Sequence, residues 1–189
     1  MKTLILNGSP HGESHTSVLI NEMKSVLEGE VKVVDTYSAN ISACKDCKYC
    51  FTNKGCSIKD DMQEIYQYIE ECDAIVIATP MHFGTLSAPL FTMCTRLQSY
   101  WAAKNDVREE KDDIKPKYGV LLVTTGGKWV NMELLIEGAA DFVFDYTNAE
   151  QIGSAYAYLT DLNPAKDNAK AIQKTRYLGQ RLNELYSNK

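Results

Sequence analysis

Short apolar segments alternate along this chain with longer segments in which hydrophobic residues recur every three or four positions. The short segments predict strands at residues 3–6, 31–34, 74–78, 118–123 and 151–158. The longer segments predict helices over residues 16–27, 60–71, 87–100, 131–144 and 167–186. In the first of these helices, Leu19, Met23 and Leu27 fall on one face. Strict alternation of strand and helix is typical of β-α-β units around a parallel sheet.

The predicted fold class is α/β, a three-layer doubly wound sheet of five parallel strands in the order 2-1-3-4-5, within a single domain over residues 1–189. Two segments interrupt the alternation. Residues 37–57 form an insert rich in cysteine, and residues 101–116 form a charged insert with weak periodicity. Ligands of such sheets bind beyond the carboxyl ends of the strands. The loops that directly follow the strands are therefore the candidate binding segments.

Composition narrows the class of protein and its compartment. The chain has 189 residues, 44% of them hydrophobic, and 25 acidic against 20 basic side chains give a net charge of -5. It has no block of Lys and Arg of the kind that nucleic acids and anionic membranes require, so neither is an expected partner. No apolar run approaches the roughly 18 residues of a membrane span, and Asn7 and Gly8 end the first apolar segment too early for a signal peptide. The predicted location is the cytoplasm, where clustered thiols indicate metal binding or redox chemistry before disulfides.

The loop after the first strand carries hydroxyl groups and glycines and leads straight into a helix. Its sequence is Asn7-Gly8-Ser9-Pro10-His11-Gly12-Glu13-Ser14-His15-Thr16. Backbone N–H groups, hydroxyls and a helix N-terminus together suit a phosphate. The chain contains neither a P-loop lysine motif nor a G-x-G-x-x-G after the strand, so a phosphomonoester fits better than a nucleotide polyphosphate. The alternative is a solvent-exposed turn with a Ser or Thr cap, which the carboxylate of Glu13 favours.

Two further loops offer flat or small groups. The loop after the third strand contains Pro80, Met81, His82, Phe83 and Gly84. The loop after the fourth strand, residues 124–127, contains small residues that let a ring approach the main chain closely. Either loop alone could be an ordinary turn packed against the core. Together, the three loops describe a phosphate at one end and a planar heterocycle at the other, which is the shape of FMN.

These motifs resemble the NAD(P)H-dependent FMN reductase family of flavodoxin-like proteins, over at least residues 1–130. The resemblance rests on Gly8-Ser9-Pro10 with Thr16 at the helix start, on Thr79-Pro80 before an aromatic turn, and on Thr124-Thr125-Gly126-Gly127. It implies FMN-phosphate contacts from Ser9, His11, Ser14, His15 and Thr16. It implies isoalloxazine contacts from Pro80, Met81, His82, Phe83, Gly84, Thr124, Thr125, Gly126 and Gly127. Relatives usually carry a basic residue where this chain has His11, so phosphate affinity is expected to depend on pH, because histidine loses its charge near neutrality.

Four cysteines gather in the first insert. Cys44, Cys47, Cys50 and Cys56 form the pattern C-x2-C-x2-C-x5-C. A cubane iron-sulfur cluster needs four cysteine thiolates from a loop that can wrap it, whereas tetrahedral zinc, a redox disulfide and unliganded thiols are the alternatives. The spacing also resembles the iron-sulfur flavoprotein branch of the same family, which implies a [4Fe-4S] cluster that passes electrons to FMN. Cys72 and Cys94 lie outside the pattern and are expected to be buried, inert thiols.

The function predicted from these features is an FMN-dependent oxidoreductase that moves electrons from NAD(P)H or a protein donor to a small acceptor. His82 is a candidate proton donor near flavin N1 or N5, and a loop histidine held by its backbone is the alternative. A non-catalytic electron carrier, or a redox sensor that uses the cysteine loop, is the second function. The charged insert at residues 101–116, together with the resemblance, predicts a homodimer or homotetramer.

Overall fold

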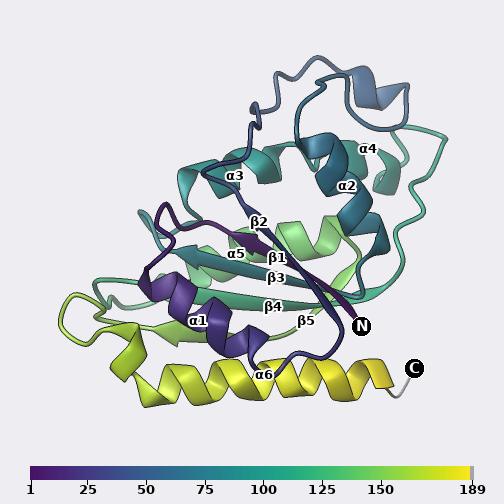
Figure 1. Cartoon of the computed structure of the whole chain (residues 1–189). Helices are drawn as coiled ribbons and strands as arrows, with labels where there is room; N and C mark the ends of the chain where they lie inside the picture. Colours follow the sequence, from purple (N-terminus) through teal and green to yellow (C-terminus); the bar gives the residue numbers. More distant parts are fainter. Residues whose placement is uncertain (188–189) are drawn as a thin grey trace.

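A five-stranded parallel sheet forms the centre of the molecule. The computed structural model describes residues 1–187, and its strands pair in the order β2-β1-β3-β4-β5 (Figure 1). The strands are β1 (Lys2–Asn7), β2 (Glu30–Asp35), β3 (Ala74–Pro80), β4 (Lys117–Thr124) and β5 (Ala149–Ala157). This is the doubly wound, flavodoxin-like strand order that the sequence predicts, so the predicted fold class is confirmed.

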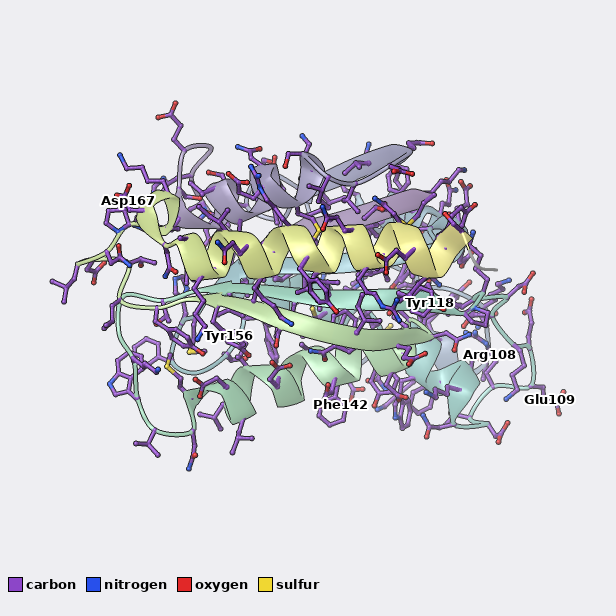
Figure 2. The ribbon with its side chains drawn as sticks, turned by 90° about the horizontal axis from the view of Figure 1, so that it is seen from below. Arg108, Glu109, Tyr118, Phe142, Tyr156 and Asp167 are labelled. Atoms are coloured by element: carbon purple, nitrogen blue, oxygen red, sulfur yellow. The ribbon has the colours of Figure 1, made fainter. Side chains whose placement is uncertain are left out.

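Helices cover both faces of the sheet. One face packs against α1 (His15–Lys24) and α6 (Ala169–Ser187). The other face packs against α2 (Met62–Glu71), α3 (Ala88–Thr95), α4 (Gln98–Lys104) and α5 (Met132–Tyr146). Figure 2 shows the sheet between α6 and α5. Along β1, side chains alternate between the two faces of the sheet. Leu4 and Leu6 join the core under α2 to α5, whereas Ile5 joins the core under α1 and α6.

The predicted helix over residues 87–100 is two helices. α3 ends at Thr95 and α4 begins at Gln98. At the break, the N–H groups of Arg96 and Leu97 donate to carbonyls three residues earlier, which tightens the chain. The hydroxyl of Tyr66 on α2 donates to the Arg96 carbonyl at 2.6 Å. This contact between distant segments occupies the carbonyl of Arg96, which lies in the middle of the single helix predicted over residues 87–100.

The predicted helix over residues 60–71 begins with two aspartates, and these differ in their roles at the start of α2. Asp60 Oδ1 accepts from the N–H of Met62 at 3.2 Å, so Asp60 does cap the first turn. The carboxylate of Asp61 instead accepts from the N–H of Asn40, at 2.8 Å. Asp61 therefore ties α2 to the chain that leaves β2. Within residues 1–187, none of the helices combines the length and apolar character needed to cross a bilayer.

Candidate functional site

The loops after β1, β3 and β4 meet at the carboxyl edge of the sheet. The N–H of Gly8 donates to the carbonyl of Ala78 at 2.8 Å, which joins the first loop to the end of β3. The N–H of Met81 donates to the carbonyl of Thr124 at 2.8 Å, which joins the second loop to the third. The three segments that the sequence singles out are therefore neighbours in space.

The first loop ends in a capping box at the N-terminus of α1. Ser14 Oγ accepts from the N–H of Ser17 at 3.0 Å, and Ser17 Oγ accepts from the N–H of Ser14 at 2.7 Å. The hydroxyl of Ser9 donates to Ser14 Oγ at 2.9 Å. Among the described residues, the backbone N–H groups of Gly12 and Glu13 have no acceptor. Unpaired donors at the positive end of a helix dipole favour an anion at this position.

The other three residues predicted to contact the phosphate differ in exposure and in hydrogen bonding. His11 is exposed on the loop. His15 Nδ1 accepts from the N–H of Ala165, at 3.3 Å, in the short 3-10 helix η2 (Ala165–Asp167). The hydroxyl of Thr16 is buried and lies 2.9 Å from the hydroxyl of Thr124. The Thr16 side chain thus joins α1 to β4 inside the protein.

The second loop is a tight turn at the end of β3. The N–H of His82 donates to the carbonyl of Thr85, and the N–H of Thr85 donates back, both at 3.0 Å. Phe83 and Gly84 between them have positive φ values of 51° and 79°. A bulky residue in this conformation carries strain that neighbouring structure must maintain, and such strain often marks functional sites. The strained turn holds Phe83 fully exposed at the loop edge.

The third loop approaches its neighbours as closely as glycine allows. A Cβ on Gly126 would lie 2.4 Å from a carboxylate oxygen of Asp161. A Cβ on Gly127 would lie 2.6 Å from the ring of Trp129, whose exposed fraction is 63%. The hydroxyl of Thr125 donates to the Gly127 carbonyl at 3.2 Å and so closes the turn. A larger side chain at either glycine would have to displace Asp161 or Trp129, both of which are exposed.

A stacked tyrosine pair at the end of β5 was not predicted. The rings of Tyr156 and Tyr158 lie 5.4 Å apart and are tilted by only 6° (Figure 2 labels Tyr156). Glu137 accepts from the Tyr156 hydroxyl at 2.6 Å, and Glu133 accepts from the Tyr158 hydroxyl at 2.8 Å. Burial, and then the neighbouring glutamate, raise the pKa of each phenol, so both stay protonated. The i, i+2 spacing of two tyrosines at a strand end was the available signal.

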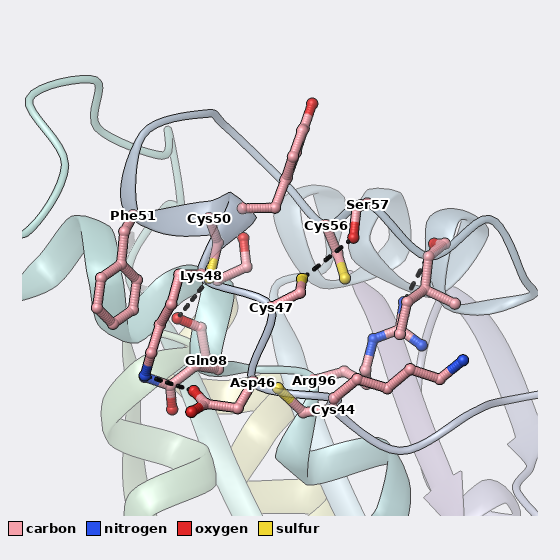
Figure 3. A pocket seen from close by; sticks show the side chains of 14 residues that line it. Cys44, Asp46, Cys47, Lys48, Cys50, Phe51, Cys56, Ser57, Arg96 and Gln98 are labelled. Carbon is pink, nitrogen blue, oxygen red and sulfur yellow. Dashed lines mark hydrogen bonds and ion pairs between the residues drawn. The ribbon is translucent and has the colours of Figure 1, made fainter.

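The cysteine insert folds over the junction of α3 and α4. Cys44, Cys47, Cys50 and Cys56 line one pocket (Figure 3). The backbone N–H of Cys44 donates to Thr95 Oγ1 at 3.0 Å. Cys47 Sγ lies 3.3 Å from the hydroxyl of Ser57, and this hydrogen bond is the main reason why the pKa of Cys47 is lowered. Within residues 1–187, no three His, Cys, Asp or Glu side chains stand in a geometry that would hold a metal ion.

The pocket lies away from the first loop. The insert directly follows the second strand, which the predicted order sets beside the first, and this predicted a position near the phosphate loop. Gly8 approaches α3 at its N-terminus, since a Cβ there would lie 2.7 Å from Ser87 Oγ. Cys44 is held by Thr95 at the C-terminus of the same helix. At 1.5 Å per residue, an eight-residue helix separates its ends by about 12 Å. The two sites therefore lie at opposite ends of α3.

Two buried arginines hold the cysteine insert. Arg96 forms an ion pair with Asp60 at 2.7 Å and donates to the carbonyls of Ser42 and Ile58, at 2.9 Å and 3.2 Å. Burial opposes the ionisation of Asp60, but hydrogen bonds from Arg96 and from the N–H of Ser42 outweigh it and lower its pKa. These contacts fasten the chain on both sides of the four cysteines.

The charged insert at residues 101–116 supplies the second arginine. Arg108 forms a buried ion pair with Asp112 at 2.6 Å and donates to the carbonyls of Asn53 and Cys50, at 3.0 Å and 3.4 Å. The two inserts, which are separate in the sequence, thus pack on one another. Their contact gives Arg108 and Asp112 of the charged segment a structural role within the chain.

The two outer cysteines differ from the pocket thiols. Burial raises the pKa of the Cys72 thiol to about 11 and that of the Cys94 thiol to about 12. Cys72 is buried as a whole residue, whereas Cys94 is partly exposed. Both thiols stay protonated near neutral pH, so they are poor nucleophiles, as expected from the sequence.

The strand order and the three loops at its carboxyl edge define a flavodoxin-like α/β protein with a candidate cofactor site on that edge. The chain belongs to the NADPH-dependent FMN reductase family, whose profile matches residues 1–144. It is therefore a flavin-dependent oxidoreductase of the FMN reductase type.

Individual proteins extend this comparison. An iron-sulfur flavoprotein from Archaeoglobus fulgidus is 31% identical over 139 residues, which cover 72% of this chain and 68% of that protein. The NAD(P)H:quinone oxidoreductase from Methanothermobacter marburgensis superposes with a TM-score of 0.73 at 16% identity, over 97% of each chain. RosB with bound 8-demethyl-8-formylriboflavin-5'-phosphate also gives 0.73 at 16% identity, over 100% of this chain and 81% of that chain. At these identities the two structures support the shared fold.

Proposed function

We propose that the loop edge binds FMN, with the phosphate at the N-terminus of α1. The unpaired N–H groups of Gly12 and Glu13, beside the hydroxyls of Ser9 and Ser14, carry this proposal. They fit a phosphate because backbone donors, hydroxyls and the helix dipole act on the same anion. The exposed His11 adds positive charge when it is protonated. The loop therefore contains the groups that the phosphate of FMN requires.

The isoalloxazine ring lies along the loops after β3 and β4. Residues 80–84 and 124–127 adjoin one another through the hydrogen bond from Met81 to Thr124. The glycines of the third loop keep side chains off the main chain, so a flat ring can approach its N–H and carbonyl groups. His82 is exposed while its backbone maintains the turn, which leaves its imidazole available as a proton donor. Trp129 and Phe83 supply exposed aromatic surface beside the ring.

Cys44, Cys47, Cys50 and Cys56 bind a [4Fe-4S] cluster in this proposal. Four thiols line one pocket, and a cubane cluster takes one thiolate at each of its four irons, so its ligands need not converge on a single ion. Relatives of this chain are named iron-sulfur flavoproteins. When bound, FMN and the cluster supply two-electron and one-electron chemistry, respectively. The protein holds the two sites apart on α3 and keeps the ring edge open to a donor.

The reaction proposed is oxidation of NAD(P)H, or of a protein donor, coupled to reduction of a small acceptor. With FMN added, we expect the isolated protein to oxidise NAD(P)H over many turnovers when a quinone is supplied, measured by the loss of nicotinamide absorbance. A protein without FMN serves as the control. A single stoichiometric reduction that does not turn over with any small acceptor would favour the electron carrier instead.

The protein is also proposed to form a homodimer or homotetramer, through a surface that differs from the insert suggested by the sequence. Large apolar side chains are exposed on α5 and just before it: Trp129, Val130, Leu134, Leu135 and Phe142. Apolar and aromatic surface of this kind is typical of interfaces.

Light scattering tests this assembly. We expect a mass at a multiple of 21.2 kDa, and a fall to the monomer mass when Leu134→Glu and Phe142→Glu are combined. Tyr177→Glu, an exposed aromatic position on α6, is the control that should keep the wild-type mass. A wild-type protein that is monomeric at micromolar concentration with FMN bound would refute the assembly.

A further inference from the structure

Arg96 is the one buried cation in the lining of the cysteine pocket, as far as the described residues show. Its exposed fraction is 1%, and it lies on the pocket wall with all four cysteines. Figure 3 shows its guanidinium group close below the side chain of Cys56. The Nη atoms donate to Asp60 and to two backbone carbonyls. Its Nε is buried and has no hydrogen-bond partner within residues 1–187.

An unpaired N–H of a buried cation is unusual, because leaving a charged donor unsatisfied costs free energy. Asp60 and two backbone carbonyls occupy both Nη atoms of Arg96, so Nε is the donor that remains. Among the thiols that line the pocket, that of Cys56 lies beside the guanidinium group in Figure 3, so its sulfur is the candidate acceptor for this donor. A sulfur ligand in this position would complete the hydrogen bonding of the guanidinium group.

Arg108 provides an internal comparison. It also belongs to a buried arginine–aspartate pair and holds the same insert. However, its Nε donates to the carbonyl of Glu110 at 2.7 Å, and its Nη atoms donate to Asp112 and to carbonyls of the insert. Arg108 thus has a partner for every nitrogen and does not line the pocket. Its role is limited to holding the chain.

We propose that Arg96 is a positioning residue for the iron-sulfur cluster, in which its Nε–H donates to the sulfur of Cys56 and its charge favours the reduced cluster. This inference rests on the proposed [4Fe-4S] cluster. Reduction adds one electron and thus one negative charge, which a nearby cation stabilises strongly at low dielectric constant. Hydrogen bonds to cluster sulfurs also raise the reduction potential. Arg96 would therefore both retain the cluster and raise its potential.

The test compares two double variants, each of which replaces both members of one ion pair. The Arg96 pair variant combines Arg96→Gln with Asp60→Asn, and the Arg108 pair variant combines Arg108→Gln with Asp112→Asn. After anaerobic reconstitution, iron and sulfide per chain, the cluster midpoint potential and the rate of iron release to a chelator are measured. We expect the Arg96 pair variant to have a more negative potential and about tenfold faster iron release, from one lost charged hydrogen bond. The Arg108 pair variant should keep the wild-type potential, and FMN binding checks the fold of both.

A wild-type potential in the Arg96 pair variant, or an equal shift in the Arg108 pair variant, would overturn the proposal and leave a structural role. If the Arg96 pair variant does not fold, Arg96→Lys decides, because it keeps the charge but lacks Nε. We expect Arg96→Lys to release iron faster than wild type with a smaller change in potential, and unchanged release would also overturn the proposal. The iron and sulfide content of the wild-type protein tests the cluster itself, independently of the variants. A wild-type protein that assembles neither would refute the cluster.

Discussion

The Cys47→Ala variant is expected to lose its iron and sulfide almost completely while it binds FMN as wild type does. A cubane cluster needs all four thiolates, and Cys47 is one of the four that line the pocket. The flavin loops lie at the other end of α3, so the substitution leaves their contacts unchanged. Because Cys47 is exposed, alanine at this position also leaves the core intact. Iron and sulfide content, visible absorbance and an FMN titration measure the result.

Cys72, a buried free thiol outside the pocket, provides a control. Cys72→Ala should retain the wild-type iron and sulfide content. With a one-electron donor, flavin reduction should become slower in Cys47→Ala but not in Cys72→Ala. Wild-type iron content in Cys47→Ala, or flavin reduction at an unchanged rate, would show that these thiols do not form the proposed electron path.

The second large effect is expected at Gly12 in the first loop. Nothing lies within 4 Å of a Cβ built at this position, so a side chain fits without steric cost. Gly12→Asp places a carboxylate beside the site proposed for the FMN phosphate. Two unit charges about 4 Å apart repel by roughly 4 kcal/mol near a protein surface and by about 1 kcal/mol in water. We therefore expect FMN affinity to fall by about thirtyfold, which corresponds to about 2 kcal/mol.

Gly12→Asn isolates the charge, because asparagine has nearly the shape of aspartate. FMN titration should give an affinity for Gly12→Asn within about threefold of wild type, since only steric and entropic effects remain. The melting temperatures of both variants without FMN should match wild type. Equal FMN affinity for the Asp and Asn variants would place the phosphate elsewhere on the molecule.

The sequence by itself was sufficient for the sheet and for the order of the loops. The inner strands β1, β3 and β4 are apolar runs buried on both faces, as Leu4 and Ile5 illustrate, and such runs are local features that the chain displays directly. Parallel strands bring their carboxyl ends to one edge, so the loops after β1, β3 and β4 had to meet there. The cysteine spacing likewise gave the four residues of the pocket, because short spacing keeps side chains close in any fold.

The tertiary structure alone decided how those segments are held. Tyr66 bonds the carbonyl of Arg96 at the break between α3 and α4, from 30 residues away, and the Thr16–Thr124 contact joins residues 108 positions apart. Periodicity reports which face of an element is apolar, but it does not report which distant polar group will satisfy a buried donor or acceptor. For the same reason, the two inserts appeared independent in the sequence. Only the folded chain shows that Arg108 joins the second insert to the first, and that Arg96 fastens the first insert beside the four cysteines.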